Sequence, residues 1–238
     1  RTGNPLDPST LLNEGLKDAT NAFFIGVAVN PERVADETYV SVYKREFNSI
    51  TAENAMKMHK ILVGLDANNQ PIYDWTQADA IVNFAEANQL NLHGHTLIWH
   101  ESIPEVLQKF KGSDAAFAHI IKTYITDVVT RYKGKVDSWD VVNEAIDDES
   151  ESIRNSIFYQ RMGEDYVKKC FELARAADNE VKLFYNDFNL VTKKKKRKAV
   201  FALVDELMTE NLIDGVGYQM HINFDFPSKS LIHKAVYY

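Results

Sequence analysis

Short runs of β-branched and aromatic residues alternate with long amphipathic segments along this chain, and this rhythm limits its possible folds more than any other feature. Strands that are separated by helices pair in parallel through right-handed crossovers. A doubly wound sheet and a (β/α)8 barrel both satisfy such a rhythm. The expected strands are Phe23–Val29, Asn48–Ala52, Asn91–Ile98, Val136–Asn143, Val181–Tyr185 and Gly215–His221.

The clearest helix signal extends from Asp114 to Tyr132. Its apolar residues recur at steps of three and one, which places them on a single stripe at helical period. The stripe consists of Phe117, Ile120, Ile121, Tyr124, Ile125, Val128, Val129 and Tyr132. Further helices are expected at Thr38–Phe47, Gln77–Ala87, Tyr166–Ala177 and Ala199–Met208, with a last one starting near Ser228.

Several of the expected strands end in polar, chemically capable residues. These endings are His95–His100, Asn143–Glu144, Asn186–Asn189 and Gln219–His221. A barrel builds its active site from such groups at the carboxyl ends of parallel strands. A dinucleotide-binding sheet needs a glycine-rich turn after the first strand, where Gly26 stands alone. We therefore predict an α/β fold, a TIM (β/α)8 barrel, with about six of its eight βα units in this chain.

Composition excludes several classes of partner. The net charge of −7 argues against a nucleic-acid surface and fits a neutral substrate such as a polysaccharide. The basic run Lys193–Lys198 is interpreted as the solvated first turn and outer face of a helix. No apolar run reaches the roughly 18 residues of a membrane span. The single cysteine, Cys170, forms no intrachain disulfide, and its apolar neighbours indicate a buried thiol.

Glu144 is the sharpest candidate for chemistry. It closes the apolar strand Trp139–Ala145, and partial desolvation at a strand end favours the protonated form of a carboxylic acid. Such a group is suited to act as a general acid. Asn143 beside it offers an amide that is able to hold a sugar hydroxyl.

Five segments together resemble glycoside hydrolase family 10, whose members are retaining endo-β-1,4-xylanases built on a TIM barrel. The segments are Ile50–Lys57, His93–His100, Trp139–Ala145, Phe184–Asn189 and Gly215–His221, and the similarity extends from about Asn13 to the end of the chain. Their order and spacing make the resemblance far more specific than any one segment. It implies a single catalytic barrel domain over residues 1–238, C-terminally incomplete, that needs no cofactor or metal.

The resemblance also assigns roles to individual residues. Glu144 would be the general acid/base that protonates the leaving glycosidic oxygen. The sugar would be bound by Glu53, Asn54, Lys57, His95, Trp99, Asn143, Gln219 and His221, the last of which would also hydrogen-bond the nucleophile. His100, Asp140 and Asn186 would orient these neighbours. Glu53 and Lys57 could instead form a surface ion pair, and we interpret Trp75 as packing and Asp187 as a structural hydrogen-bond acceptor.

The chain departs from the family pattern in two places. Ala55 and Met58 stand where the family usually has an acidic residue and a tryptophan, which affects distal substrate preference. A retaining glycosidase also needs a second carboxylate, roughly 5–5.5 Å from the first. The resemblance places that nucleophile on strand seven, beyond this chain, since Asp225 is expected to lie in the loop leaving strand six.

The leading expectation is therefore an endo-1,4-β-xylanase acting on xylan or xylo-oligosaccharides, with strands seven and eight missing or supplied by a second polypeptide. This chain alone is expected to be inactive. Two alternatives stay open, a catalytically silent glycan-binding barrel and another β-glycanase of cellulase type. The resemblance implies a secreted or periplasmic protein, although the N-terminal residues Arg1–Pro5 contain no signal-peptide core.

Overall fold

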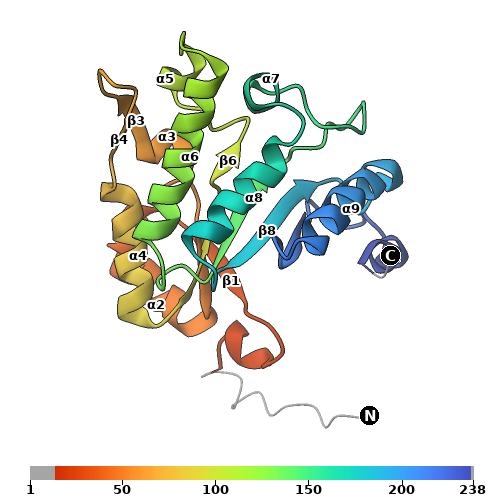
Figure 1. Cartoon of the computed structure of the whole chain (residues 1–238). Helices are drawn as coiled ribbons and strands as arrows, with labels where there is room; N and C mark the ends of the chain where they lie inside the picture. Colours follow the sequence, from red (N-terminus) through yellow and green to blue (C-terminus); the bar gives the residue numbers. More distant parts are fainter. Residues whose placement is uncertain (1–13, 237–238) are drawn as a thin grey trace.

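A parallel sheet that curls into part of a barrel forms the centre of the molecule (Figure 1). The structure is a computed structural model in which residues 14–236 are described, so Arg1–Pro5 lies outside the described residues. The strands follow the order β1 (Gly26–Val29), β2 (Ser49–Ala52), β5 (Asn91–Gly94), β7 (Ser138–Asn143), β8 (Lys182–Phe188) and β9 (Gly215–Gln219). The predicted α/β barrel architecture is confirmed.

Helices cover the outside of this sheet, with α6 and α8 side by side across it in Figure 1. The longer helices are α2 (Glu37–Glu46), α4 (Thr76–Asn88), α6 (Asp114–Arg131), α8 (Tyr166–Ala177), α9 (Lys194–Thr209) and α10 (Lys229–Val236). The shorter ones are η1 (Leu16–Ala19), α1 (Pro31–Val34), α3 (Met58–Ile61), α5 (Glu105–Gln108) and α7 (Ile157–Met162). The Ser113 hydroxyl accepts from the Ala116 amide and starts α6.

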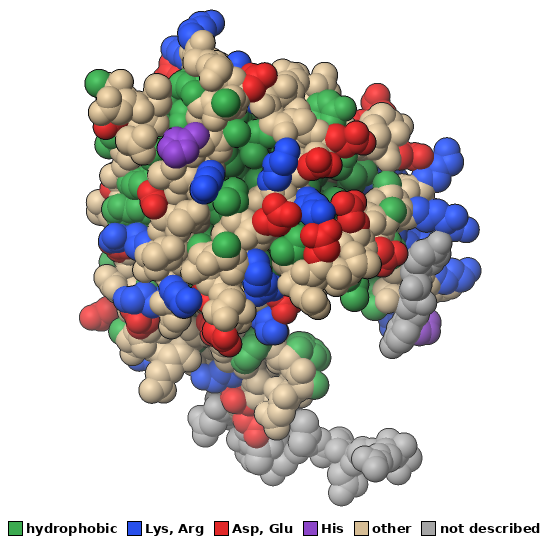
Figure 2. Space-filling view, viewed as in Figure 1, with side chains coloured by type: hydrophobic (Ala, Val, Ile, Leu, Met, Phe, Trp, Pro, Cys, Tyr) green, Lys and Arg blue, Asp and Glu red, His purple; other side chains and the backbone are tan. Residues whose placement is uncertain are grey.

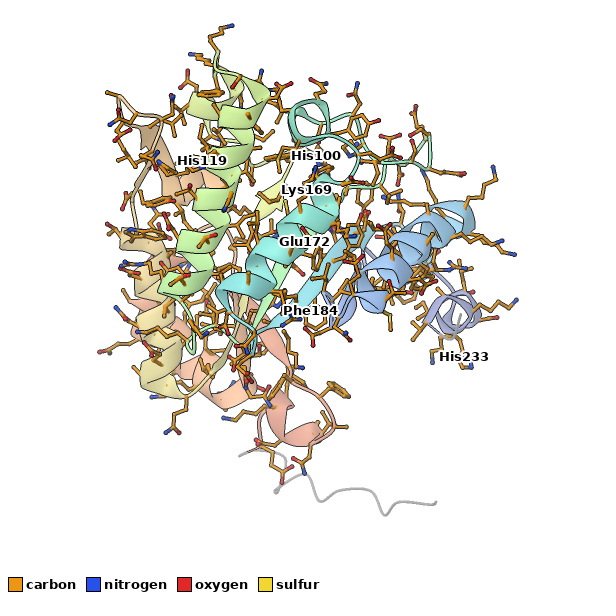
Figure 3. All side chains as sticks on the ribbon, in the orientation of Figure 1. His100, His119, Lys169, Glu172, Phe184 and His233 are labelled. Carbon is orange, nitrogen blue, oxygen red and sulfur yellow. The ribbon has the colours of Figure 1, made fainter. Side chains whose placement is uncertain are left out.

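The apolar stripe of α6 faces the core as predicted. Phe117, Ile120 and Tyr124 are fully buried, and the remaining members of the stripe are buried too. The opposite faces of the helices are polar. In Figure 3, His119 projects from α6 and Lys169 and Glu172 from α8, and Figure 2 shows acidic and basic side chains interspersed over this side of the molecule.

Two elements differ from the expected strand pattern. The segment after β2 contains an antiparallel hairpin, β3 (Leu62–Leu65) and β4 (Pro71–Tyr73), which we did not predict. The expected strand Asn91–Ile98 is divided into β5 and the two-residue β6 (Ile98–Trp99), and both pair with β7. This division places Trp99 directly opposite Asn143, at the carboxyl end of the sheet.

The interpretation of the lysine run as solvated is wrong for two of its residues. The α9 helix begins at Lys194, five residues before the expected start at Ala199, so Lys196 lies in its first turn. Lys196 is 0% exposed and Arg197 is 6% exposed. A cation buried to this extent must have an anionic or carbonyl partner.

Both outer strands leave an edge unpaired within residues 14–236, since β1 pairs only with β2 and β9 only with β8. Large apolar side chains are exposed near these edges. Phe23 and Phe24 precede β1 and are 66% and 64% exposed, and Phe224 after β9 is fully exposed. The sheet therefore presents two apolar borders. No helix in the described part of the chain has the length and apolar character needed to cross a membrane.

Candidate active site

The polar strand ends meet around an open cleft of about 380 Å³ at the carboxyl edge of the sheet. Its lining consists of Thr51, His95, Trp99, Asn143, Glu144, Asn186, Gln219, Met220 and His221. Six of the predicted site residues are thus brought together, and Asn186, predicted to act behind them, also reaches the cleft. Asp225 is exposed and lies outside this lining, as expected.

Glu144 is buried beneath the cleft, with only 9% of its surface exposed. Its Oε2 accepts a hydrogen bond of 2.9 Å from Trp99 Nε1, and its Oε1 accepts one of 2.8 Å from Gln219 Nε2. Asn143 Nδ2 lies 3.3 Å from the same Oε1. The backbone of Glu144 is left-handed, with φ of 58°. Donors from three strands therefore hold the carboxylate in one orientation.

Side-chain hydrogen bonds connect the ends of β7, β8 and β9. Asn186 Nδ2 donates to Asn143 Oδ1 at 2.9 Å, and Gln219 Nε2 lies 3.1 Å from the same oxygen. His221 Nε2 lies 2.9 Å from Gln219 Oε1. The amide side chains thus offer several uncharged donors and acceptors, the kind of polar group that fixes the orientation of a ligand in a pocket.

Two histidines share one buried carboxylate beside the cleft. Asp140 Oδ2 lies 2.7 Å from His95 Nδ1 and 3.0 Å from His93 Nε2. Burial alone would raise the pKa of Asp140, but the charges and hydrogen bonds of the two histidines lower it. Asp140 therefore orients His95 from behind the cleft lining, and the contact of His93 with the same carboxylate was not predicted.

The three residues predicted from strand two, Glu53, Asn54 and Lys57, are not part of the cleft lining, and Lys57 lies beside Trp99. Lys57 Nζ lies 5.1 Å from the centre of the Trp99 ring and donates to Asn54 Oδ1 at 3.0 Å. Burial lowers the pKa of Lys57, and the charges of Glu53 and Glu144 oppose this effect. The ammonium thus bonds Asn54 instead of forming the alternative surface pair with Glu53.

His100 supports the other side of Trp99. The two rings meet edge to face, with centroids 6.3 Å apart, and His100 Nε2 lies 3.3 Å from Glu101 Oε1. Burial and the nearby Arg154 lower the pKa of His100. His100 therefore packs against the indole without lining the cleft. Trp75 packs far from these residues, against Tyr73 with ring centroids 4.6 Å apart.

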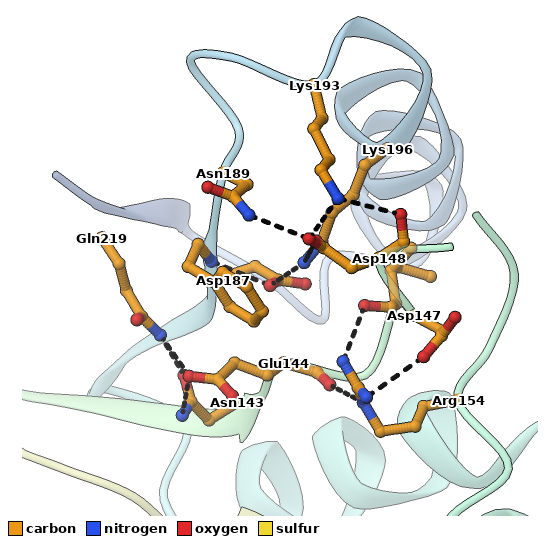
Figure 4. A network of polar contacts seen from close by, with 12 residues as sticks. Asn143, Glu144, Asp147, Asp148, Arg154, Asp187, Asn189, Lys193, Lys196 and Gln219 are labelled. Atoms are coloured by element: carbon orange, nitrogen blue, oxygen red, sulfur yellow. Dashed lines mark hydrogen bonds and ion pairs between the residues drawn. The ribbon is translucent and has the colours of Figure 1, made fainter. Parts of the chain in front are cut away.

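The loop that follows Glu144 is held by a network of charged groups (Figure 4). Arg154 Nε donates to the Glu144 carbonyl at 3.2 Å, and its Nη1 lies 3.1 Å from Asp147 Oδ2. Asp148 Oδ1 accepts from Lys196 Nζ at 2.8 Å. The same carboxylate also pairs with Lys193. These contacts fix the backbone on the carboxyl side of the candidate acid.

The innermost part of this network is a buried ion pair between Lys196 and Asp187, 2.8 Å apart, and both side chains are 0% exposed. Asp187 also accepts from the Tyr185 hydroxyl at 2.6 Å, and that hydroxyl accepts from the Ile146 amide at 3.1 Å. Burial raises the pKa of Asp187 even though Lys196 and Tyr185 donate to it. Asp187 is the expected structural acceptor. The sequence of the run Lys193–Lys198 does not indicate which of its six cations contacts Asp187.

Comparison with known proteins supports the family resemblance seen in the sequence. A family model described as glycosyl hydrolase family 10 matches residues 15–237. Endo-1,4-beta-xylanase A of Thermotoga maritima is 40% identical over 217 residues, which cover 89% of this chain and 20% of that protein. This chain therefore spans only about one fifth of the length of that curated relative.

Solved structures agree with the sequence comparison. A psychrophilic family 10 endo-beta-1,4-xylanase has 39% identity and a TM-score of 0.85, covering 94% of this chain and 70% of that one. A mutant of Cellvibrio japonicus Xylanase10C in complex with xylopentaose has 36% identity and a TM-score of 0.84, covering 94% of this chain and 46% of that one. With its curled sheet and the family match over nearly all described residues, this chain belongs to glycosyl hydrolase family 10.

Proposed function

We propose that this chain supplies the acid/base half of an endo-1,4-β-xylanase active site. The observation that carries the proposal is the position of Glu144, whose two carboxylate oxygens accept from Trp99 and Gln219 in a cleft lined by amide, imidazole and indole side chains. Relatives that carry the name xylanase, and the xylopentaose complex of one of them, support xylan as the substrate. Secretion stays a prediction.

In the proposed reaction, Glu144 protonates the leaving glycosidic oxygen and later removes a proton from the attacking water. Asn143 and His95 hold sugar hydroxyls, and Trp99 forms a wall of the cleft. A second carboxylate, roughly 5–5.5 Å from the first, forms the covalent glycosyl intermediate and gives retention of configuration. We place this nucleophile in the region of the relatives that the present chain does not cover.

The unpaired edges of β1 and β9 are the proposed docking sites for the remaining strands. Main-chain pairing at both edges would close the barrel and cover the exposed Phe23 and Phe24. The remaining strands can be supplied in the same polypeptide or by a second one. Either arrangement would bring the missing carboxylate to the side of the cleft opposite Glu144.

The test compares residues 1–238 with a completed barrel, in which this chain is continued by the remaining region of a family 10 relative. Residues 1–238 alone should release no reducing sugar from xylan, because general acid help is typically worth only about 10²–10⁴-fold. The completed barrel should hydrolyse xylan. Robust hydrolysis by residues 1–238 would contradict the placement of the nucleophile.

The role of Glu144 is tested in the same completed barrel. Glu144→Gln should reduce xylan cleavage by about 10²–10⁴-fold and should reduce cleavage of an aryl glycoside with a good leaving group much less. Added azide should partly restore turnover of the activated substrate. An equal loss on both substrates, without rescue, would count against the assignment. Binding of xylopentaose without any hydrolysis would favour the silent glycan-binding barrel, and preference for cellopentaose the cellulase-type alternative.

A further inference from the structure

His93 does not line the cleft, yet its ring contacts the carboxylate that orients His95. His93 lies on β5, and His95 follows the last residue of that strand. Both reach the same oxygen, Asp140 Oδ2. This arrangement joins a side chain outside the cleft to one inside it.

The shared oxygen fixes where the hydrogens lie. An ionised carboxylate oxygen only accepts hydrogen bonds, so the two nitrogens that face it, His95 Nδ1 and His93 Nε2, both carry a hydrogen. Neutral His95 must then have its lone pair on Nε2, on the other side of the ring. From there it can accept a hydrogen bond from a sugar hydroxyl in the cleft.

The second nitrogen of His93 has a partner that suits either charge state. His93 Nδ1 lies 2.7 Å from Ser138 Oγ. A serine hydroxyl donates to a neutral ring nitrogen and accepts from a protonated one. His93 can therefore hold an additional proton without losing a hydrogen bond on either side.

The surroundings of His93 favour the charged form. Asp140 is the carboxylate that faces it from β7, while β8 presents the Phe184 ring edge to face with centroids 6.0 Å apart, and Thr51 of β2 is its register partner. Burial alone would lower the pKa of His93, but the charge and hydrogen bond of Asp140 raise it. The single negative charge of Asp140 favours one additional proton on the pair of imidazoles, and the two rings compete for it.

We propose that His93 is a positioning residue that holds the positive charge of the His93–Asp140–His95 group, and so keeps His95 neutral with Nε2 free to accept from the substrate. The charged His93 neutralises Asp140, which removes the main reason for His95 to take up a proton. Without a cation at position 93, Asp140 would attract the proton to His95. His95 Nε2 would then carry a hydrogen, and it would donate to a sugar hydroxyl instead of accepting from one.

The test follows the His95 ring nitrogens by ¹⁵N NMR in the ligand-free chain. With His93 present, Nε2 should give the signal of an unprotonated nitrogen at about pH 7. In His93→Gln, where an amide donor replaces the cation, it should move to the protonated position. His93→Arg, which restores a permanent cation, should return it. Ser138→Ala should shift the signal in the same direction as His93→Gln but by less.

An unchanged His95 signal in both His93→Gln and Ser138→Ala would overturn the inference, as would a protonated Nε2 in the unmodified chain. Thermal unfolding of each variant separates loss of fold from change of charge. Because the contact of His95 with sugar rests on the proposed function, xylopentaose binding is measured separately, by calorimetry on the completed barrel. We expect about tenfold weaker binding for His93→Gln and recovery in His93→Arg. Absence of xylopentaose binding in the completed barrel with His93 intact would remove the proposed function and leave the NMR result intact.

Discussion

Trp99 donates its indole N–H to Glu144 Oε2 over 2.9 Å, so the residue that forms a wall of the cleft also orients the candidate acid. The two residues lie on adjacent strands, since β6 pairs Trp99 with Asn143, the residue directly before Glu144. In the proposed function, stacking against sugar and orientation of Glu144 are therefore carried by one side chain, and substitutions can separate them.

Replacing Trp99 with Phe should keep an aromatic face and remove the donor to Glu144. In the completed barrel, turnover of xylan should fall by about tenfold, the worth of one hydrogen bond to a charged group, with little change in xylopentaose affinity. Trp99→Ala should weaken affinity as well, because the ring itself is lost. Steady-state kinetics and calorimetry measure the two effects. Equal losses of affinity in Trp99→Phe and Trp99→Ala would contradict the separation.

Lys57 is predicted to bind sugar beyond the point of cleavage. In the completed barrel, Lys57→Ala should lower kcat/KM for long xylo-oligosaccharides by about tenfold, because remote binding energy helps to position the scissile bond. Short activated glycosides should be affected little. The exposed neighbour Lys60 provides the control, and Lys60→Ala should leave both substrates unchanged. If short and long substrates lose rate together after Lys57→Ala, the subsite assignment is wrong.

The buried pair between Lys196 and Asp187 should dominate local stability. Lys196→Met leaves Asp187 buried without its cation and should lower the free energy of unfolding by about 3–5 kcal/mol. Lys195 is 81% exposed at its side chain, and Lys195→Met should change this free energy by less than about 0.5 kcal/mol. Combining Lys196→Met with Asp187→Asn should recover part of the loss. Denaturant unfolding of the four proteins measures these differences, and equal effects at positions 195 and 196 would refute the burial of Lys196.

The ionisation of Asp148 should make the free energy of unfolding depend on pH in the acid range. Burial would raise the pKa of Asp148, but hydrogen bonds from Lys193, Lys196 and Asn189 lower it to about 2. A carboxyl group whose pKa is lower in the folded state stabilises the fold above its unfolded pKa of about 3.9 and loses that contribution as the pH falls. The free energy of unfolding should therefore decrease between about pH 4 and pH 2. Asp148→Asn should flatten this part of the profile, and an unchanged slope would show that Asp148 is not paired in the folded state.

Local sequence was sufficient to place Glu144 and its neighbours at one edge of the sheet. Each cleft residue lies at the end of a strand whose apolar run is visible in the sequence, and in a parallel barrel all such ends meet at one edge. Asn143, Glu144 and Gln219 could therefore be placed together without a structure. The burial of the α6 stripe follows from periodicity in the same way.

Contacts that depend on strand register could not be predicted. His93 meets Ser138 because these two residues are register partners of β5 and β7, and only the three-dimensional pairing reveals this. The burial of Lys196 has a similar origin, because α9 starts one turn earlier than its apolar pattern indicates. The β3–β4 hairpin was missed since its strands are short and half-buried, without a clear alternation of apolar and polar residues.

Successive side chains of a strand point to opposite faces, so Asn143 and Glu144 would ordinarily be separated by the sheet itself. The positive φ of 58° at Glu144 turns its side chain back to the side that Asn143 occupies, and both line the cleft. The last residue of β7 and the residue that follows it thereby line the same cleft. β-Branched residues are poorly tolerated in this conformation, whereas asparagine adopts it more readily. The backbone at position 144 thus restricts replacements independently of any demand for a carboxylate, and a library at this site should retain folded variants rich in Asn, Asp and Gly.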